Sequence, residues 1–471
     1  AEVAAEVLAG NGIRVYIYPE LMPTPALSFA VRNLSCSGGI VITASHNPAK
    51  YNGYKVYGAD GCQITTKAAK EILAKINAVD IFSGVKSMKF AKGIEQKRIS
   101  YIGEETMEAF IRAVSAQSLC GDAACDKSVS IVYTPLNGTG LKCVLRCLKE
   151  NGFTNISVVK EQAEPNGHFP TCPYPNPEIR EALELGLKEA RRLGSELLLA
   201  TDPDCDRVGI AVKSGDDFVL LSGNEVGMLL LDYICKRRLA LKRMPKNPLV
   251  VKTIVTIDMA KRIAADYGVQ VIDVLTGFKF IGEQIGFLEK KGQEDRYILG
   301  FEESYGYLTG SYVRDKDAVN ASLMICEMFA YYKAKGQSLL DVLNGLYTKY
   351  GYCLNTLHSY EFEGASGFRK MQDIMEKLRD NCPKTWMRRK IISVSDYQMS
   401  ITRYNDGRVE KIDLPVSNVL KFELEDNLSV VVRPSGTEPK LKMYMSVSAG
   451  SREEAGDLER HFVKELEAMF A

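Results

Sequence analysis

The sequence has almost no excess charge of either sign and no long apolar run. Its 60 lysines and arginines oppose 59 aspartates and glutamates, which leaves a formal net charge of +1. A chain this close to neutrality has no electrostatic bias toward nucleic acid or anionic membranes. No apolar run reaches the length of about 20 residues that a membrane-spanning helix needs. We therefore expect neither a nucleic-acid partner nor a membrane partner.

Cysteine pairs with the spacing of a metal or redox motif are also absent. The 12 cysteines include no Cys-x-x-Cys pair and are scattered through apolar or helix-like segments. Reduced thiols in the cytoplasm are the simplest account of this pattern, so we predict a cytoplasmic protein. With 46% hydrophobic residues, a chain of 471 residues can bury several cores.

Strand-like runs alternate with helix-like segments along the first 345 residues or so. Residues 1–12 form an amphipathic pattern that ends in glycine, which predicts a helix. The runs predicted as strands are 14–18, 40–43, 129–133, 156–159, 197–201, 208–212, 249–253 and 271–274. Alternation at this spacing indicates an α/β fold with mixed sheets. Shorter strands and helices after about residue 345 predict a different last domain.

A serine in a loop of small residues is the first candidate for chemistry. Residues 38–42 predict a buried strand, and 43–48, Thr-Ala-Ser-His-Asn-Pro, follow it directly. Ser45 lies where other chain atoms can approach closely, and His46 and Lys55 are near enough in sequence to donate hydrogen bonds to an anion. Such a hydroxyl is suited to carry a phosphoryl group. Taken alone, 43–48 can equally be a plain turn, which is the commoner place for a loop serine.

Three aspartates alternate with other residues directly after the apolar run 197–200. On an extended segment, Asp202, Asp204 and Asp206 would all point the same way. Three converging carboxylates repel one another unless a cation neutralises them, and an all-oxygen set suits Mg²⁺ better than Zn²⁺. We predict that the three aspartates are magnesium ligands, with Arg207 beside them. The alternative is a solvated acidic loop.

A short glycine-containing segment follows the predicted strand 129–133. Residues 137–140, Asn-Gly-Thr-Gly, have the appearance of a nucleotide-binding loop, but the third glycine and a ribose-binding acid are missing. We interpret the segment as a plain turn from strand to helix.

Four motifs occur in the order and rough spacing of the α-D-phosphohexomutases. They are 43–48, 202–207, 300–306 (Gly-Phe-Glu-Glu-Ser-Tyr-Gly) and 433–439 (Arg-Pro-Ser-Gly-Thr-Glu-Pro). The chain resembles the phosphoglucomutase branch of that family from near its first residue to its last helix. Four motifs in register are specific, whereas any one alone would be weak. Because a preceding segment supplies the first strands and a phosphate-touching loop in the family, we expect this chain to be N-terminally truncated.

The resemblance implies three similar mixed-sheet α/β domains and a smaller α+β C-terminal domain around a central cleft. The predicted boundaries are 1–118 for a phosphoserine domain, 119–222 for a metal-binding domain, 223–345 for a sugar-binding domain and 346–471 for a phosphate-binding domain.

The resemblance also implies how the substrate is held. Glu302 and Ser304, one residue apart in an extended loop, would bind the sugar hydroxyls O3 and O4. Residues 276–280, with Gly277 and Phe278, are similar to the specificity loop of the third domain. The phosphate that does not react would be held by Arg433, Ser435, Gly436 and Thr437, which offer a guanidinium fork, two hydroxyls and a backbone amide.

The basic residues near these motifs have two possible roles. Lys55 and Lys316 can bind phosphate or, with a lowered pKa, move a proton to or from a sugar hydroxyl. His46 is a phosphate contact or a base, and Arg207 is predicted to contact the substrate.

The resemblance implies a reaction that interconverts glucose 1-phosphate and glucose 6-phosphate, a step of glucose metabolism. Phosphorylated Ser45 would transfer its phosphoryl group through a glucose 1,6-bisphosphate intermediate, which also serves as activator, with Mg²⁺ between the phosphoserine and the three aspartates. The alternatives are a phosphopentomutase, a phosphomannomutase or a catalytically impaired sugar-phosphate-binding protein. A magnesium-dependent phosphatase would have no need of the second phosphate grip at 433–437. The oligomeric state stays open.

Overall fold

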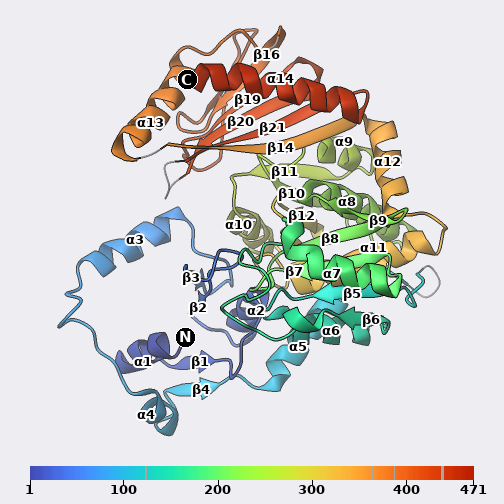
Figure 1. The fold of residues 1–471 in the computed structure, drawn as a ribbon. Helices are drawn as coiled ribbons and strands as arrows, with labels where there is room; N and C mark the ends of the chain where they lie inside the picture. Colours follow the sequence, from blue (N-terminus) through green and yellow to red (C-terminus); the bar gives the residue numbers. More distant parts are fainter. Residues whose placement is uncertain (122–124, 363, 387, 436–439, 471) are drawn as a thin grey trace. The chain divides into compact units, whose positions relative to one another are not determined.

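The computed structural model describes residues 1–121, 125–362, 364–386, 388–435 and 440–470. The chain divides into two units, which Figure 1 shows as a ribbon coloured along the sequence. Unit 1 contains Ala1–Lys252, Gly268–Ile272 and Gly277–Leu339, and unit 2 contains Thr253–Tyr267, Asp273–Thr276 and Leu340–Ala471. All eight runs predicted as strands are strands, and the predicted first helix is α1 (Glu2–Gly10).

The N-terminal part of unit 1 has two separate pairs of strands. β1 (Val15–Ile17) lies parallel to β4 (Ile99–Tyr101), and β2 (Gly38–Ile42) lies antiparallel to β3 (Tyr54–Gly58). β2 is exposed or half-buried along its length, so the prediction of a buried strand before Ser45 is wrong; among the described strands, β3 alone pairs with it. The register places Val41 opposite Lys55, which brings Lys55 back toward the loop after β2. The helices of this part are α2 (Thr24–Asn33), α3 (Thr66–Asn77), α4 (Phe90–Glu95) and α5 (Glu104–Ser115).

The next part of unit 1 is built on a five-stranded mixed sheet of order β6-β5-β7-β8-β9. β5 (Ile131–Thr134) is parallel to β6 (Ile156–Val158) and to β7 (Leu197–Thr201), while β8 (Val208–Ser214) runs antiparallel to β7 and to β9 (Asp217–Leu221). Every residue of β7 is buried, as its apolar sequence predicts. The helical segments here are α6 (Gly140–Glu150), η1 (Lys160–Gln162) and α7 (Arg180–Leu193). The three aspartates occupy the turn between β7 and β8.

A four-stranded sheet of order β11-β10-β12-β13 follows. β10 (Leu249–Thr253) is parallel to β12 (Tyr297–Phe301), and β12 turns back into β13 (Tyr307–Leu308). The remaining elements are α8 (Gly223–Ala240), α9 (Met259–Asp266), β11 (Gln270–Val274), α10 (Phe278–Glu289), η2 (Glu294–Arg296) and α11 (Ala318–Lys333). α11 is buried along nearly its whole length, and the side chain of Asp317 caps its first turn by accepting the amides of Val319 and Asn320.

The C-terminal part of unit 2 is rich in antiparallel strands, which confirms the prediction of a different last domain. Its sheet has the order β14-β21-β20-β19-β16-β17-β18, with β15 paired to β16. α13 and α14 pack on this sheet over a core in which the Trp386 ring lies 4.7 Å from the Phe422 ring. The elements are α12 (Leu339–Tyr350), β14 (Tyr352–Glu361), α13 (Gly364–Asp380), β15 (Thr385–Trp386), β16 (Arg389–Asp396), β17 (Ile401–Tyr404), β18 (Val409–Lys411), β19 (Leu420–Leu424), η3 (Glu425–Asn427), β20 (Leu428–Pro434), β21 (Lys440–Ala449) and α14 (Arg452–Phe470).

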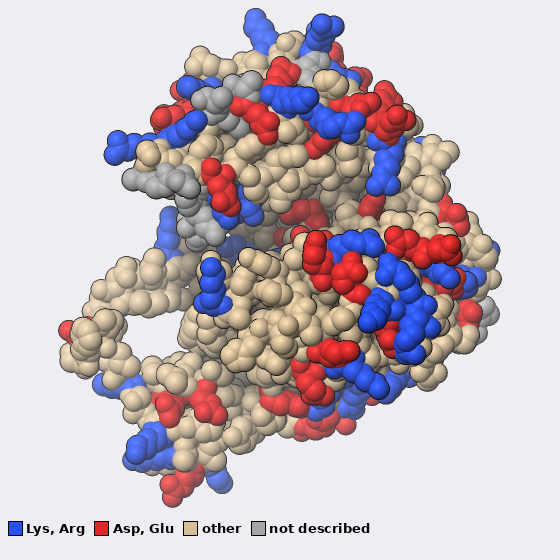
Figure 2. All heavy atoms as spheres, viewed as in Figure 1, with Lys and Arg blue, Asp and Glu red and all other residues tan. Residues whose placement is uncertain are grey.

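Surface charge and cysteine pairing can be compared with the expectations from composition. Figure 2 shows basic and acidic side chains intermixed on the face in view, in line with the net charge of +1. Within the described ranges, no helix combines the length and the apolar character that crossing a membrane requires. Cys120 and Cys125 form a disulfide, so the expectation of reduced thiols is wrong for this pair, whose Cα atoms lie 6.0 Å apart. The cytoplasmic location stays a prediction.

Candidate active site

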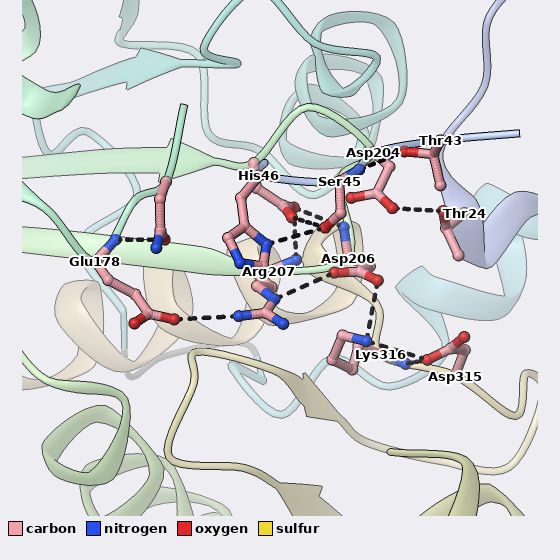
Figure 3. A network of polar contacts seen from close by, with 12 residues as sticks. Thr24, Thr43, Ser45, His46, Glu178, Asp204, Asp206, Arg207, Asp315 and Lys316 are labelled. Carbon is pink, nitrogen blue, oxygen red and sulfur yellow. Dashed lines mark hydrogen bonds and ion pairs between the residues drawn. The ribbon is translucent and has the colours of Figure 1, made fainter. Parts of the chain in front are cut away.

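Ser45 lies in the turn after β2 with its hydroxyl directed at a carboxylate from the middle of the chain. Its Oγ donates a hydrogen bond to Asp202 Oδ2 at 3.0 Å and lies 3.1 Å from Nδ1 of His46. Its backbone φ of 52° is in the left-handed region, which serine rarely adopts, and its amide donates to Thr43 Oγ1 at 2.8 Å. Such local strain is held in place by surrounding contacts and is common at functional sites. Figure 3 shows Ser45 and His46 beside the aspartate turn.

The three aspartates converge through a tight turn, and the prediction of an extended segment is wrong. Asp202 Oδ1 accepts the amides of Asp206 at 3.0 Å and Arg207 at 2.9 Å, and Cys205 N donates to Asp202 O at 2.9 Å. These hydrogen bonds form the turn, because a short aspartate side chain readily accepts hydrogen bonds from backbone amides a few residues further along the chain. Carboxylate oxygens of Asp202, Asp204 and Asp206 all lie within 4.8 Å of one another, and all three residues are buried.

Two lysines from distant elements contact the turn. Lys55 Nζ, from β3, lies 3.0 Å from Asp204 Oδ2 and 3.4 Å from Asp206 Oδ2. Lys316 Nζ, just before α11, lies 3.0 Å from Asp206 Oδ2. Figure 3 shows Lys316 and Asp206 approaching each other from different elements. The structure therefore places both predicted lysines against the predicted metal ligands.

The pKa values of these lysines argue against the lowered values that a neutral base would need. Burial by itself lowers the pKa of Lys55, but Asp206 and then Asp204 raise it above its ordinary value. Burial also lowers the pKa of Lys316, but the neighbouring negative charges, of which Asp206 is the strongest, outweigh it and raise the pKa. In this arrangement the pKa of both lysines is raised, which is the opposite of what the proton-transfer alternative needs. Of the two predicted roles, binding an anion fits a lysine that keeps its charge.

The aspartates themselves differ in their electrostatic surroundings. Burial raises the pKa of Asp202 well above its ordinary value, and the neighbouring carboxylates raise it further. Burial also acts on Asp206, but the ammonium groups of Lys316 and Lys55 outweigh it and lower its pKa. The Oδ1 atoms of Asp204 and Asp206 are buried and accept no hydrogen bond from any described residue. Asp206 Oδ1 does lie 3.8 Å from Arg207 Nε, as an ion pair. Buried carboxylate oxygens that accept no hydrogen bond, in an all-oxygen set, fit a hard divalent cation.

His46 and Arg207 complete the surroundings of the serine. Burial, and after it the guanidinium of Arg207, lower the pKa of His46 to about 4, so the imidazole is neutral at pH 7. A neutral ring nitrogen next to Ser45 Oγ can exchange a proton with it. Arg207 is largely buried and pairs with Glu178 at 3.1 Å, which fixes the direction of its guanidinium.

Three of the four predicted sugar-binding residues lie close together in unit 1. Glu302 is only 5% exposed and accepts the amide of Gly277 at 3.0 Å, and the Phe278 ring centre lies 5.9 Å from Lys316 Nζ. Burial raises the pKa of Glu302 to about 7. Glu302 and Ser304 belong to the turn between β12 and β13, closed by a bond from Glu302 N to Gly306 O at 2.9 Å, so the prediction of an extended loop is wrong.

The predicted phosphate grip lies in unit 2. Arg433 stands near the end of β20, opposite Lys442 of β21, and is half-buried. The amide of Ser435 donates to Lys440 O at 2.7 Å. Gly436 and Thr437 lie outside the described residues. The role of this segment stays a prediction.

Several contacts to the aspartate turn and its lysines were not predicted. Thr24 donates both its hydroxyl and its amide to Asp204, and Tyr57 Oη donates to Asp315 Oδ2 at 2.6 Å. Thr139, in the segment interpreted as a plain turn, donates its amide and its hydroxyl to Pro203 O at 2.8 and 3.0 Å. The alternation of β3 places Tyr57 on the same face as Lys55, a signal that sequence reasoning overlooked. No local pattern marks Thr24.

A serine beside buried carboxylates and lysines is the kind of site that transfers phosphoryl groups. The sequence matches three profiles described as Phosphoglucomutase/phosphomannomutase, alpha/beta/alpha domains I, II and III, at residues 1–81, 108–215 and 222–350. It is 36% identical over 452 residues to a protein of Staphylococcus saprophyticus named phosphoglucomutase, covering 96% of this chain and 80% of that protein. The chain belongs to the phosphoglucomutase/phosphomannomutase family of the α-D-phosphohexomutases, and it is an enzyme of the phosphotransferase and isomerase type.

Solved structures share the fold. A phosphoglucomutase of Paramecium, pp63/parafusin in its open form, has a TM-score of 0.68 at 17% identity and covers 99% of this chain and 84% of that chain. An N-acetylphosphoglucosamine mutase of Aspergillus fumigatus, in complex with GlcNAc-6P and magnesium, has a TM-score of 0.51 at 13% identity and covers 100% of each chain. These similarities confirm the predicted α/β fold class. The four-domain boundaries and the roles of individual residues stay predictions.

Proposed function

We propose that this enzyme is a phosphoglucomutase, which interconverts glucose 1-phosphate and glucose 6-phosphate. The observation that carries the proposal is the hydrogen bond of 3.0 Å from Ser45 Oγ to Asp202, which joins a nucleophile from one part of the chain to a buried carboxylate set from another. The name of the Staphylococcus saprophyticus relative supports glucose phosphates as substrates.

Ser45 is the phosphoryl carrier in this proposal. A hydroxyl of the sugar phosphate attacks the phosphorus of phosphorylated Ser45, the bond from phosphorus to Oγ breaks, and the proton of the attacking hydroxyl ends on Ser45 Oγ. The product of this half-reaction is glucose 1,6-bisphosphate. After the bisphosphate reorients, Ser45 Oγ takes the other phosphoryl group and releases the isomer. Glucose 1,6-bisphosphate from solution reloads an unphosphorylated Ser45, and so acts as activator.

Charged side chains around Ser45 bind and orient the transferred group. Lys55 and Lys316 remain protonated beside the carboxylates and contact the negative phosphoryl oxygens. His46, neutral at pH 7 and 3.1 Å from Ser45 Oγ, accepts the proton of the attacking sugar hydroxyl and passes it to Ser45 Oγ as phosphate leaves, and it accepts the Ser45 proton when phosphate returns. Arg207, held by Glu178, contacts the substrate.

The carboxylates of Asp202, Asp204 and Asp206, together with the phosphoserine, would hold Mg²⁺. Two observations support this: the buried Oδ1 atoms of Asp204 and Asp206 have no hydrogen-bond donor among the described residues, and the Aspergillus fumigatus enzyme was solved with magnesium. When bound, the ion neutralises charge on the phosphoryl group during transfer.

Residues farther from the serine bind the rest of the substrate. Glu302 and Ser304 bind sugar hydroxyls, beside the Gly277 and Phe278 loop. The phosphate that does not react is held by Arg433, Ser435, Gly436 and Thr437. We retain the four domains with their predicted boundaries and a cytoplasmic location as part of this proposal.

A substrate panel tests the proposal. The full-length protein is assayed with 1-phosphates of glucose, mannose, N-acetylglucosamine, ribose and deoxyribose, with the matching bisphosphate present, and Ser45→Ala serves as control. We expect the highest kcat/KM with glucose 1-phosphate, no turnover by the variant, and phosphate on Ser45 by mass spectrometry. A higher kcat/KM with mannose or pentose phosphate would change the proposed substrate but leave the proposed type of reaction unchanged. Binding of sugar phosphates without any turnover or phosphoserine would identify a binding protein.

A further inference from the structure

Thr24 makes two contacts with one of the three aspartates. Its hydroxyl donates to Asp204 Oδ2 at 3.2 Å, and its amide donates to Asp204 O at 2.9 Å. Thr24 is the first residue of α2 and is only 1% exposed. The prolines on both sides, Pro23 and Pro25, restrict the backbone and hold Thr24 in place. Figure 3 shows the Thr24 hydroxyl directed at the Asp204 carboxylate.

The two carboxylate oxygens of Asp204 have different surroundings. Oδ2 receives the Thr24 hydroxyl and also Lys55 Nζ at 3.0 Å. Oδ1 is buried and accepts no hydrogen bond from the described residues. A carboxylate anchored through one oxygen has a fixed plane, so the direction of the free oxygen is fixed as well.

Among the described contacts, neither Asp202 nor Asp206 is anchored in this way from α2. Asp202 is oriented from within its own turn, by the amides of Asp206 and Arg207, and Asp206 is oriented by the two lysines. Thr139 also contacts the turn, but it donates to the backbone oxygen of Pro203 and reaches no carboxylate.

We infer that Thr24 is a positioning residue for the divalent-cation site: its hydroxyl holds Asp204 so that the free carboxylate oxygen faces the cation. The inference rests on the proposed function, which assigns Asp202, Asp204 and Asp206 as the ligands. Hydrogen bonds that orient a metal ligand typically change the metal affinity 10- to 100-fold when they are removed. A merely structural threonine would instead change the stability of the fold and leave the affinity unchanged.

The test measures cation affinity directly, without substrate or turnover. Mn²⁺ is titrated into the metal-free full-length protein, and free Mn²⁺ is followed by electron paramagnetic resonance, with Mg²⁺ competition for the natural ion. Thr24→Val keeps the shape and the amide contact but removes the hydroxyl, and Thr24→Ser keeps the hydroxyl. The matched control is Thr309→Val, because buried Thr309 likewise donates its hydroxyl and its amide to one residue, Asn320. Asp202→Asn tests the ligand set itself.

We expect Thr24→Val to weaken Mn²⁺ binding about 10- to 100-fold. Thr24→Ser should stay close to the wild-type affinity, and Thr309→Val should lower the melting temperature without changing the affinity. If Thr24→Val does not fold, Thr24→Ala replaces it.

Wild-type affinity in Thr24→Val, together with loss of binding in Asp202→Asn, would overturn the inference and leave the proposed function standing. Equal losses of Mn²⁺ affinity in Thr24→Val and Thr309→Val would also overturn the inference, because the weaker binding would then result from a less stable fold. Wild-type affinity in Asp202→Asn would instead overturn the assignment of the ligands, and with it the metal part of the proposed function.

Discussion

The buried carboxyl of Asp317 makes the stability of the protein depend on pH in a direction that can be worked out. Asp317 has no exposed surface, accepts the amides of Val319 and Asn320 at 2.8 and 3.0 Å, and receives the Tyr312 hydroxyl at 2.7 Å. Burial nevertheless raises the pKa of Asp317 from 3.8 to about 6. The folded protein therefore binds a proton here that the unfolded chain has already lost between about pH 4 and pH 6.

That difference in proton binding determines whether the stability of the protein rises or falls with pH. A pKa raised by folding contributes stability that is fully present below the unfolded pKa and is lost as the pH rises through the folded pKa. The shift of about 2 units, at 1.36 kcal/mol per unit, corresponds to on the order of 3 kcal/mol. The free energy of unfolding should therefore fall by about this amount between pH 4 and pH 7 on account of Asp317 alone.

Asp317→Asn isolates this contribution, because asparagine can still accept the two amides at the helix start but cannot ionise. Thermal unfolding of wild type and variant is measured from pH 4 to pH 8, with the exposed Asp413→Asn as control. We expect the two proteins to have the same melting temperature near pH 4. As the pH rises through 6, the melting temperature of the variant should become higher than that of wild type. The control should follow wild type throughout. A difference between wild type and Asp317→Asn that stays constant over this range would refute the reasoning.

Three further predictions concern the proposed active site. Ser45→Ala should abolish phosphoryl transfer while sugar-phosphate binding by calorimetry stays near wild type; full turnover would exclude Ser45 as carrier. Arg433→Ala should raise KM for glucose 1-phosphate about 10- to 100-fold, because a charge-assisted bidentate contact contributes on the order of 1.5 to 3 kcal/mol; an unchanged KM in steady-state kinetics would show that Arg433 does not bind the substrate phosphate. Lys316→Met removes an ammonium 3.0 Å from buried Asp206 and should lower the free energy of unfolding by on the order of 3 kcal/mol, measured in urea; wild-type stability would mean that Lys55 and Arg207 are enough to neutralise Asp206.

The sequence by itself was enough for the main elements, and it singled out candidate residues that the structure brings together. Apolar runs such as 197–201 and 249–253 are strands, because short apolar runs between turn residues are typical of strands buried in a sheet. The serine and the three aspartates could be recognised as candidates because a serine in a loop of small residues and three alternating aspartates directly after an apolar run are uncommon patterns. Their proximity is visible in the structure, while their roles still await the experiments above.

Only the tertiary structure decided how these residues meet. The aspartates converge through a turn that is closed by backbone amides, and Thr24 reaches Asp204 across 180 residues of sequence. The raised pKa of Lys55 and the lowered pKa of His46 also could not be read from neighbours in the sequence. Local patterns reflect the preferences of nearby residues, whereas burial and charge act through space, between residues that only the folded chain brings together.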